Sequence, residues 1–154
     1  MSLQRNAVNK QPWRRDRAFY RFCLDLPTRY ADVDTERHIN NVAVQSLHAE
    51  TRTQWHLALF GTEAWLGLTA TMRPAAVATD FIAITHYPAP VRCGLALMRL
   101  DGQGYTLASA LFQDGHCVSV QECLMGAWQN GKRAALPAGM GERLAAYGLT
   151  EAPQ

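Results

Sequence analysis

The spacing of apolar positions predicts one long helix near the start of the chain. From Val42 to Phe60 there is no glycine or proline, and apolar residues recur at the 3.6-residue period of an α-helix. The positions that share one stripe are Val44, Leu47, Thr51, Trp55, Ala58 and Leu59. Asn40 or Asn41 is suited to the N-cap, and Gly61 follows the last turn. With a rise of about 1.5 Å per residue, the helix would be roughly 28 Å long.

Extended segments flank this helix. Residues 19–30 carry bulky strand-type side chains and are interrupted by Pro27, and residues 75–87 are rich in β-branched and aromatic residues. Three further strands are predicted at residues 93–100, 105–113 and 117–129. Asp-Gly pairs at 101–102 and 114–115 indicate hairpins, Asn130-Gly131 indicates a later turn, and residues 141–147 predict a short amphipathic helix.

A strand, a long helix and then a meander of antiparallel strands favour an α+β fold over a doubly wound α/β sheet. A sheet wrapped around the helix would bury its apolar stripe, and strand curvature or a partner subunit would cover the other helix faces. We expect a single domain over residues 18–150. Residues 1–17 are polar and basic and contain Pro12, so they are expected to form a flexible tail.

Composition narrows the class of protein. A formal net charge of +2 is too small to predict a nucleic-acid partner, although the basic residues before position 22 could contact RNA or anionic lipid. No apolar run approaches the ~20 residues of a membrane span, and no signal-peptide pattern is present, so a cytoplasmic location without membrane partners is expected. The four cysteines show no metal spacing, and we expect neither a metal nor a cofactor.

Polar and ionisable side chains concentrate just before the predicted helix. They are those of Asp32, Asp34, Glu36, His38, Asn40 and Asn41. The first backbone N–H groups of a helix are unpaired and carry partial positive charge, so they can polarise a carbonyl oxygen. A nearby carboxylate could attack that carbonyl or activate water. The residues alone leave open a loop whose carboxylates are merely solvated. A calcium loop is excluded because Arg37 and Ala43 stand where its glycine and closing glutamate belong.

A family resemblance favours the catalytic interpretation. The run Tyr30-Ala31-Asp32-Val33-Asp34, then His38-Ile39-Asn40-Asn41 and Glu50-Thr51-Arg52, resembles the motif of the 4-hydroxybenzoyl-CoA thioesterase-like proteins of the hotdog superfamily. Downstream, Tyr87-Pro88-Ala89-Pro90 with Gly94 resembles a turn of the same family. The resemblance covers about residues 19–145. It implies a hotdog fold, an antiparallel sheet around one central helix, assembled as a homodimer or a dimer of dimers. It also implies hydrolysis of an acyl-CoA thioester without a metal or bound cofactor.

The resemblance also suggests roles for individual residues. Asp34 matches the catalytic aspartate, which acts as nucleophile or general base, and the backbone N–H near Asn41 would donate to the thioester oxygen. Asn40 and Asn41 would hold the water or orient the aspartate. His38 is either a second acid–base group or a structural hydrogen-bonding residue.

Other matched positions are expected to contact the substrate or support the loop. Asp32 matches the first aspartate of the motif, and Glu50 faces the site or pairs with Arg29 or Arg52. Val44 and Leu47 occupy helix positions that are often tyrosine in the family, so the identity of the acyl group stays open. Arg37 replaces the usual glycine, and Leu95 replaces an aspartate. Arg73 or Arg92 could meet the CoA phosphates.

Two other functions stay open: a hotdog-fold hydratase or dehydratase acting on enoyl or hydroxyacyl thioesters, and a non-catalytic acyl-CoA-binding protein. The absence of G-x-S-x-G argues against a serine hydrolase. His48 and His56 are predicted on the polar side of the helix, and His86 and His116 are predicted to lack partners.

Overall fold

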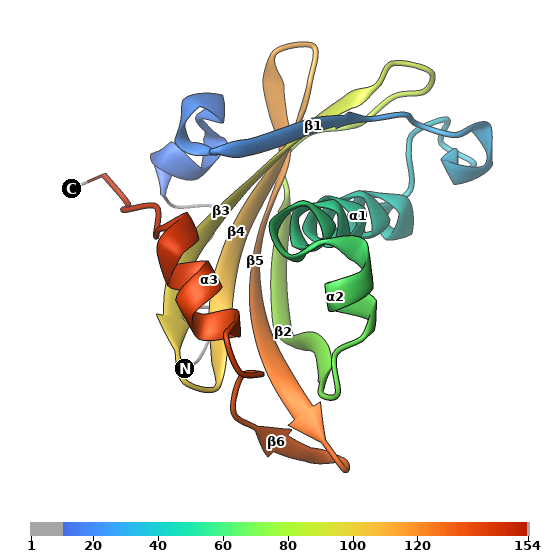
Figure 1. The fold of residues 1–154 in the computed structure, drawn as a ribbon. Coiled ribbons are helices and arrows are strands. Elements are labelled where there is room, and N and C mark those ends of the chain that lie inside the picture. The colour runs from blue at the N-terminus through green and yellow to red at the C-terminus, as the bar shows by residue number, and fades with distance from the viewer. Residues whose placement is uncertain (1–10, 154) are drawn as a thin grey trace.

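The predicted long helix is present as α1, Asn41–Phe60, and lies against one face of a curved antiparallel sheet (Figure 1). The computed structural model describes residues 11–153. Asn40 is the N-cap, since its side-chain oxygen accepts from the Ala43 N–H at 2.8 Å, and Gly61 follows the helix with a φ of +83°. The N-cap and C-terminal signals of the sequence are therefore confirmed.

The sheet contains six strands in the order β1-β3-β4-β5-β2, with β6 added to β5. The strands are β1 (Phe22–Leu26), β2 (Thr71–Phe81), β3 (Val91–Asp101), β4 (Gly104–Gln113), β5 (His116–Gln129) and β6 (Lys132–Ala134). Two further α-helices are α2 (Thr62–Leu66) and α3 (Met140–Tyr147). Short 3-10 turns are η1 (Pro12–Arg15), η2 (Arg17–Phe19) and η3 (Tyr30–Asp32). This arrangement is the expected α+β hotdog fold.

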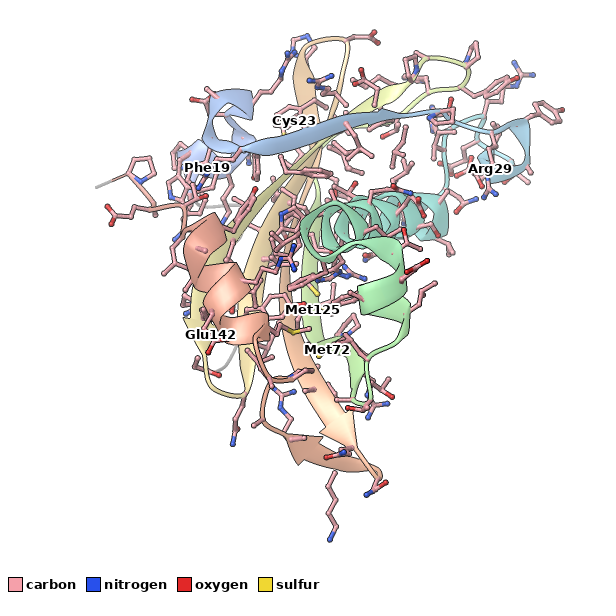
Figure 2. All side chains as sticks on the ribbon, in the orientation of Figure 1. Phe19, Cys23, Arg29, Met72, Met125 and Glu142 are labelled. Atoms are coloured by element: carbon pink, nitrogen blue, oxygen red, sulfur yellow. The ribbon has the colours of Figure 1, made fainter. Side chains whose placement is uncertain are left out.

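Successive side chains of the central strands point to opposite faces of the sheet, so each face has its own core. On the concave side, Trp55 of α1 packs with Leu97, Leu107 and Tyr105 of β3 and β4. Met72 and Met125 extend the same cluster toward α2 (Figure 2). On the convex side, the neighbouring positions of the same strands are mostly small: Ala96, Ala108 and Ala110. The sheet therefore carries its large apolar side chains on the face that holds α1.

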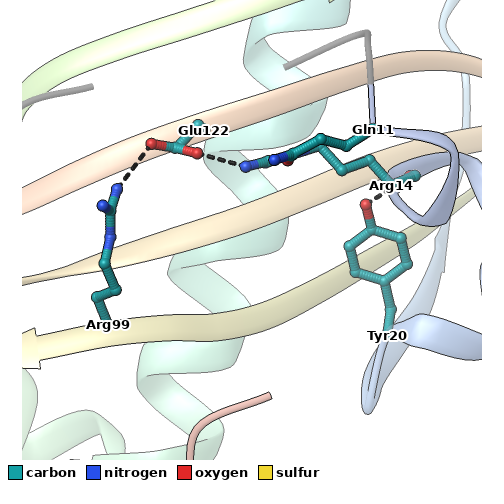
Figure 3. A network of polar contacts seen from close by, with 5 residues as sticks. All are labelled: Gln11, Arg14, Tyr20, Arg99 and Glu122. Carbon is teal, nitrogen blue, oxygen red and sulfur yellow. Dashed lines mark hydrogen bonds and ion pairs between the residues drawn. The ribbon is translucent and has the colours of Figure 1, made fainter. Parts of the chain in front are cut away.

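The convex side is covered by the N-terminal residues. Residues 11–17, the described part of the expected flexible tail, fold as 3-10 turns, so they differ from that expectation; residues 1–10 lie outside the described part. Arg14 is only 6% exposed and forms an ion pair with the buried Glu122, which also binds Arg99 at 3.1 Å (Figure 3). Tyr20 donates its hydroxyl to the Arg14 carbonyl at 2.6 Å. A buried charge with a partner on the sheet explains why this segment is ordered.

His48 and His56 are buried, so their predicted place on the polar side of the helix is wrong. The sheet curves around α1 and presents polar partners to these rings. His48 lies 2.7 Å from Ser109 Oγ through Nδ1 and 3.0 Å from Ser119 Oγ through Nε2. Because Ser119 donates to the Asp80 carbonyl at 3.0 Å, we assign the proton of His48 to Nε2 and the Ser109 hydroxyl as donor to Nδ1.

Burial lowers the pKa of both His48 and His56 to about 3, with a smaller contribution from the nearby Arg52 charge. The unfolded chain binds these protons near pH 6.5, so stability is fully present above that pH and is lost as the pH falls toward 3. We expect each histidine to reduce the free energy of unfolding by up to about 2 kcal/mol between pH 6.5 and pH 5. Urea unfolding of wild type and His48→Gln at both pH values would measure this.

The control for that experiment is His116→Gln, which removes an exposed ring at the start of β5. The His48→Gln protein should lose less stability on acidification than wild type, whereas the His116→Gln protein should follow wild type. Equal losses in all three proteins would contradict a neutral, buried His48.

Strand β2 ends at Phe81, six residues before the predicted end at residue 87. Beyond it, the N–H groups of Ile82 and Ala83 both donate to the Val118 carbonyl, so the ladder stops there. The following segment is instead fixed by the buried Gln113 side chain, which bonds to the backbone of His86 and Ala89. This departure from the sheet brings residues 81–86 beside the start of α1.

Within residues 11–153, no helix is long and apolar enough to cross a membrane. The same part of the chain brings no three His, Cys, Asp or Glu side chains together in a way that could hold a metal ion.

Candidate functional site

The polar loop before α1 is held in one shape by its own backbone. Val33 and Ile39 form an isolated antiparallel bridge, which closes the loop. The backbone N–H and the side-chain Nδ2 of Asn40 both donate to the Asp32 carbonyl, at 2.9 and 2.8 Å. With its oxygen capping the helix at Ala43, Asn40 joins the loop to α1, so its observed role is structural.

Asp34 is oriented by this loop. Its Oδ1 accepts from the N–H groups of Glu36 and His38 at 2.9 and 3.1 Å, and its own N–H donates to the His38 carbonyl at 2.8 Å. Among residues 11–153, no donor lies within hydrogen-bonding distance of Oδ2, and the residue is exposed. One carboxylate oxygen is therefore anchored while the other is available to a ligand.

Arg37 occupies the turn position where the related motif has glycine, and it adopts a left-handed backbone conformation with a φ of +66°. A residue with a Cβ carries a cost of about 1–2 kcal/mol in this region. The Arg37 N–H donates to the Asp34 carbonyl at 3.0 Å, which keeps the turn closed. The turn thus forms without a glycine, at the expense of local strain.

The loop and the start of α1 form one wall of a cleft of about 540 Å³. Asp34, Glu36, His38, Asn40, Asn41 and Val44 line this wall. The opposite wall is the segment 81–85, which is largely apolar. Within the described residues, the backbone N–H groups of Asn41 and Val42 have no acceptor, as expected for the first turn of a helix. The cleft therefore combines a carboxylate, free N–H donors and an apolar wall.

His86 contacts His38 of this site, so the expectation that it has no partner is wrong. Its ring meets that of His38 nearly edge to face, with centroids 5.4 Å apart and planes at 76°. The Ile39 N–H also donates to the Thr85 carbonyl at 2.9 Å, so the two segments are directly joined. The residues are 48 positions apart, and no local pattern in the sequence indicates the contact.

Three of the predicted site residues line a different hollow from the cleft of Asp34. Asp32, Leu47 and Glu50 line a separate depression of about 350 Å³ beside α1. Arg29 binds Asp32 at 2.6 Å, and this hydrogen bond lowers the pKa of the Asp32 carboxyl. Glu50 accepts from Gln54 at 2.7 Å and, within residues 11–153, has no ion pair with Arg29 or Arg52. The predicted site thus divides between two surfaces.

Comparison with solved structures supports the fold assignment. The PA5185 protein of Pseudomonas aeruginosa is 21% identical with a TM-score of 0.78, covering 91% of this chain and 99% of that one. A thioesterase of Thermus thermophilus, crystallised with coenzyme A and Zn, is 16% identical with a TM-score of 0.72, over 82% and 94% of the two chains. The SAV2348 protein of Staphylococcus aureus, crystallised in complex with CoA, is 15% identical with a TM-score of 0.74, over 82% of both.

No family model and no curated protein sequence matches the chain. At the identities of the structural matches, the likeness establishes the fold. This chain is a hotdog-fold protein, and its structural resemblance to thioesterases of that fold agrees with the sequence motif.

Proposed function

We propose that this protein is an acyl-CoA thioesterase that uses Asp34 to hydrolyse a thioester bound in the cleft at the start of α1. The observation that carries the proposal is the meeting of a free carboxylate oxygen with unpaired helix N–H groups in one cleft. Acyl transfer requires both, since one group drives attack on the carbonyl and the other stabilises the charge that develops on its oxygen. The thioesterase names and CoA complexes among the structural matches support the same chemistry.

In the proposed reaction, the thioester oxygen receives hydrogen bonds from the N–H groups near Asn41. Water adds to the carbonyl carbon as its proton passes to Asp34 Oδ2, or Asp34 attacks first and water cleaves the resulting anhydride. The C–S bond breaks when the adduct with water collapses or, in the second route, when the anhydride forms, and the sulfur takes a proton from His38 or solvent. The products are the free acid and CoA.

The apolar wall of the cleft is suited to the acyl group. Phe81 and Ile84 are 47% and 54% exposed, although large apolar side chains are usually buried. Val44 lies on the opposite wall, where a larger residue would fill the space. An acyl chain lying against Phe81 and Ile84 would remove their exposed apolar surface from water.

We also propose that the chain forms a homodimer through strand β2. This strand is eleven residues long, and among the described residues no strand pairs with its outer edge. A long exposed edge carrying apolar side chains, such as Val77 and Phe81, is suited to pairing with a second copy. Pairing there would place segment 81–85, and with it the apolar wall of each cleft, at the interface.

For the assembly, light scattering should give about twice the chain mass of 17.1 kDa. Val77→Glu should favour the monomer because it places a charge on the apolar edge that the second copy would cover. Leu149→Glu, a matched change at an exposed site outside β2, should leave the dimer intact. A monomeric wild-type protein would contradict the proposal.

For the activity, free thiol release should be measured with benzoyl-, short-, medium- and long-chain acyl-CoAs. Turnover of at least one of them is expected, and the preferred acyl group would define the apolar wall. Failure with every thioester would overturn the proposed hydrolysis, and assays of hydration and of CoA binding would then separate the two remaining functions.

A further inference from the structure

A second hollow lies on the other side of Asp34. Its volume is about 440 Å³, and it is lined by Tyr30, Val33, Asp34, Arg37 and Tyr87. Asp34 is the residue that this hollow shares with the cleft described above. A ligand whose reacting bond sits at Asp34 can therefore extend in two directions, with one end against segment 81–85 and the other against the tyrosines and Arg37.

The chemistry of the two hollows differs. The first has an apolar wall, whereas the second presents two tyrosine rings and a guanidinium. Tyr30 and Tyr87 are 77% and 44% exposed and meet edge to face with centroids 5.9 Å apart. Exposed aromatic rings of this kind are platforms on which a planar base can stack.

Arg37 supplies the positive charge. It is exposed, and within residues 11–153 no carboxylate lies within 4 Å of its guanidinium. An arginine fork without a partner is suited to a phosphate, which it can bind through two parallel hydrogen bonds.

The backbone of Arg37 strengthens the inference. It is held at a φ of +66°, a conformation that glycine adopts without strain. Strained residues persist where the surrounding structure fixes their conformation, and they concentrate at active sites and ligand-binding sites. The turn that orients Asp34 also positions the side chain of Arg37. A ligand that binds the positive charge of this side chain would explain why arginine stands here in place of glycine.

We propose that Tyr30, Tyr87 and Arg37 form a subsite for the adenine nucleotide of a CoA thioester, with the base against the tyrosines and a phosphate on Arg37. This inference rests on the proposed thioesterase function and deepens it. It assigns the two hollows to the two ends of one substrate and favours CoA thioesters over thioesters that lack a nucleotide.

The test uses Arg37→Gly, because glycine fits the left-handed turn and the variant should fold at least as well as wild type. The probes are 3′,5′-adenosine diphosphate, followed by calorimetry, and two thioesters of the same acid, one with CoA and one with N-acetylcysteamine. Affinity for the diphosphate should fall about tenfold or more. The KM for the CoA thioester should rise similarly, while kcat/KM for the N-acetylcysteamine thioester stays unchanged.

Matched controls separate charge from backbone effects. Asn130→Gly makes the same kind of change at another residue of positive φ, in the β5–β6 turn, and Arg143→Gln removes one exposed positive charge from α3. Both should bind the diphosphate as wild type does. Tyr30→Leu should weaken diphosphate binding without changing kcat/KM for the N-acetylcysteamine thioester.

Equal effects of Arg37→Gly on both thioesters, or no effect on either, would overturn the subsite. So would a wild-type protein that binds no diphosphate. The calorimetric result does not depend on turnover. If wild type hydrolyses no thioester yet binds the diphosphate through Arg37, the proposed hydrolysis fails and the nucleotide subsite stands.

Discussion

Replacing Asp34 by asparagine is expected to lower kcat for thioester hydrolysis by about 100-fold or more while the protein stays folded. The amide oxygen of asparagine can still accept from the N–H groups of Glu36 and His38, so the loop that closes at Val33 and Ile39 should keep its shape. The free oxygen becomes an NH₂ group, which can neither attack a carbonyl nor take a proton from water. The measurement is thiol release with the preferred acyl-CoA, run beside wild type.

Asp114→Asn provides the control. Asp114 lies in the β4–β5 turn with a φ of +51°, a conformation that asparagine tolerates, and it is outside the cleft. Its activity should equal that of wild type. If Asp34→Asn retained wild-type kcat with intact folding, Asp34 would not be the catalytic group, even though the fold would be unaffected.

Glu122→Ala is expected to destabilise the protein by about 3–5 kcal/mol, the typical cost of breaking a buried ion pair by removing one partner. The side chains of Glu122 and Arg14 are 5% and 7% exposed, so the guanidinium would remain buried without a carboxylate. One Arg14 nitrogen, Nη1, already lacks a partner among residues 11–153, which leaves little capacity to compensate. Urea unfolding at pH 7 would give the free energy of unfolding.

Arg99→Ala removes the other cation that contacts Glu122, but the Arg99 side chain is 44% exposed. Its loss should cost no more than about 1 kcal/mol, because partly exposed pairs are screened by solvent. If Glu122→Ala proves too unstable to purify, Glu122→Gln keeps the shape and one acceptor and should show a smaller loss. A cost below about 1 kcal/mol for Glu122→Ala would mean that Arg14 reaches solvent easily and does not hold the N-terminal turns in place.

The elements that the sequence predicted well are those governed by local pattern. The 3.6-residue period of α1, its Asn40 cap and the Gly-containing turns each depend on a few neighbouring residues. The N-terminal turns could not be predicted this way, because the pair that holds Arg14 joins residues 108 positions apart. Without its partner on β5, a basic segment is indistinguishable from a solvated tail.

The candidate site shows the same division. Asp34, His38, Asn40 and Asn41 are close in sequence, so their grouping at the start of α1 was predictable. The wall formed by segment 81–85 and the contact of His86 with His38 were missed. The position of His86 depends on the side chain of Gln113, which is 27 residues further along the chain. Leu47 and Glu50 were assigned to the site from a helix motif, yet α1 turns them toward a different surface.

The covered convex face restricts how larger assemblies can be built. This face carries mostly small side chains, among them Ala96, Ala108 and Ala110, and two sheets can pack face to face through such surfaces. In this chain residues 12–20 already occupy the surface. They are held there by the ion pair of Arg14 with Glu122 and by Tyr20, which packs on Gly94. If the proposed dimer forms, two dimers could not stack through this face unless residues 12–20 detached from it, so a tetramer would have to be joined through other surfaces.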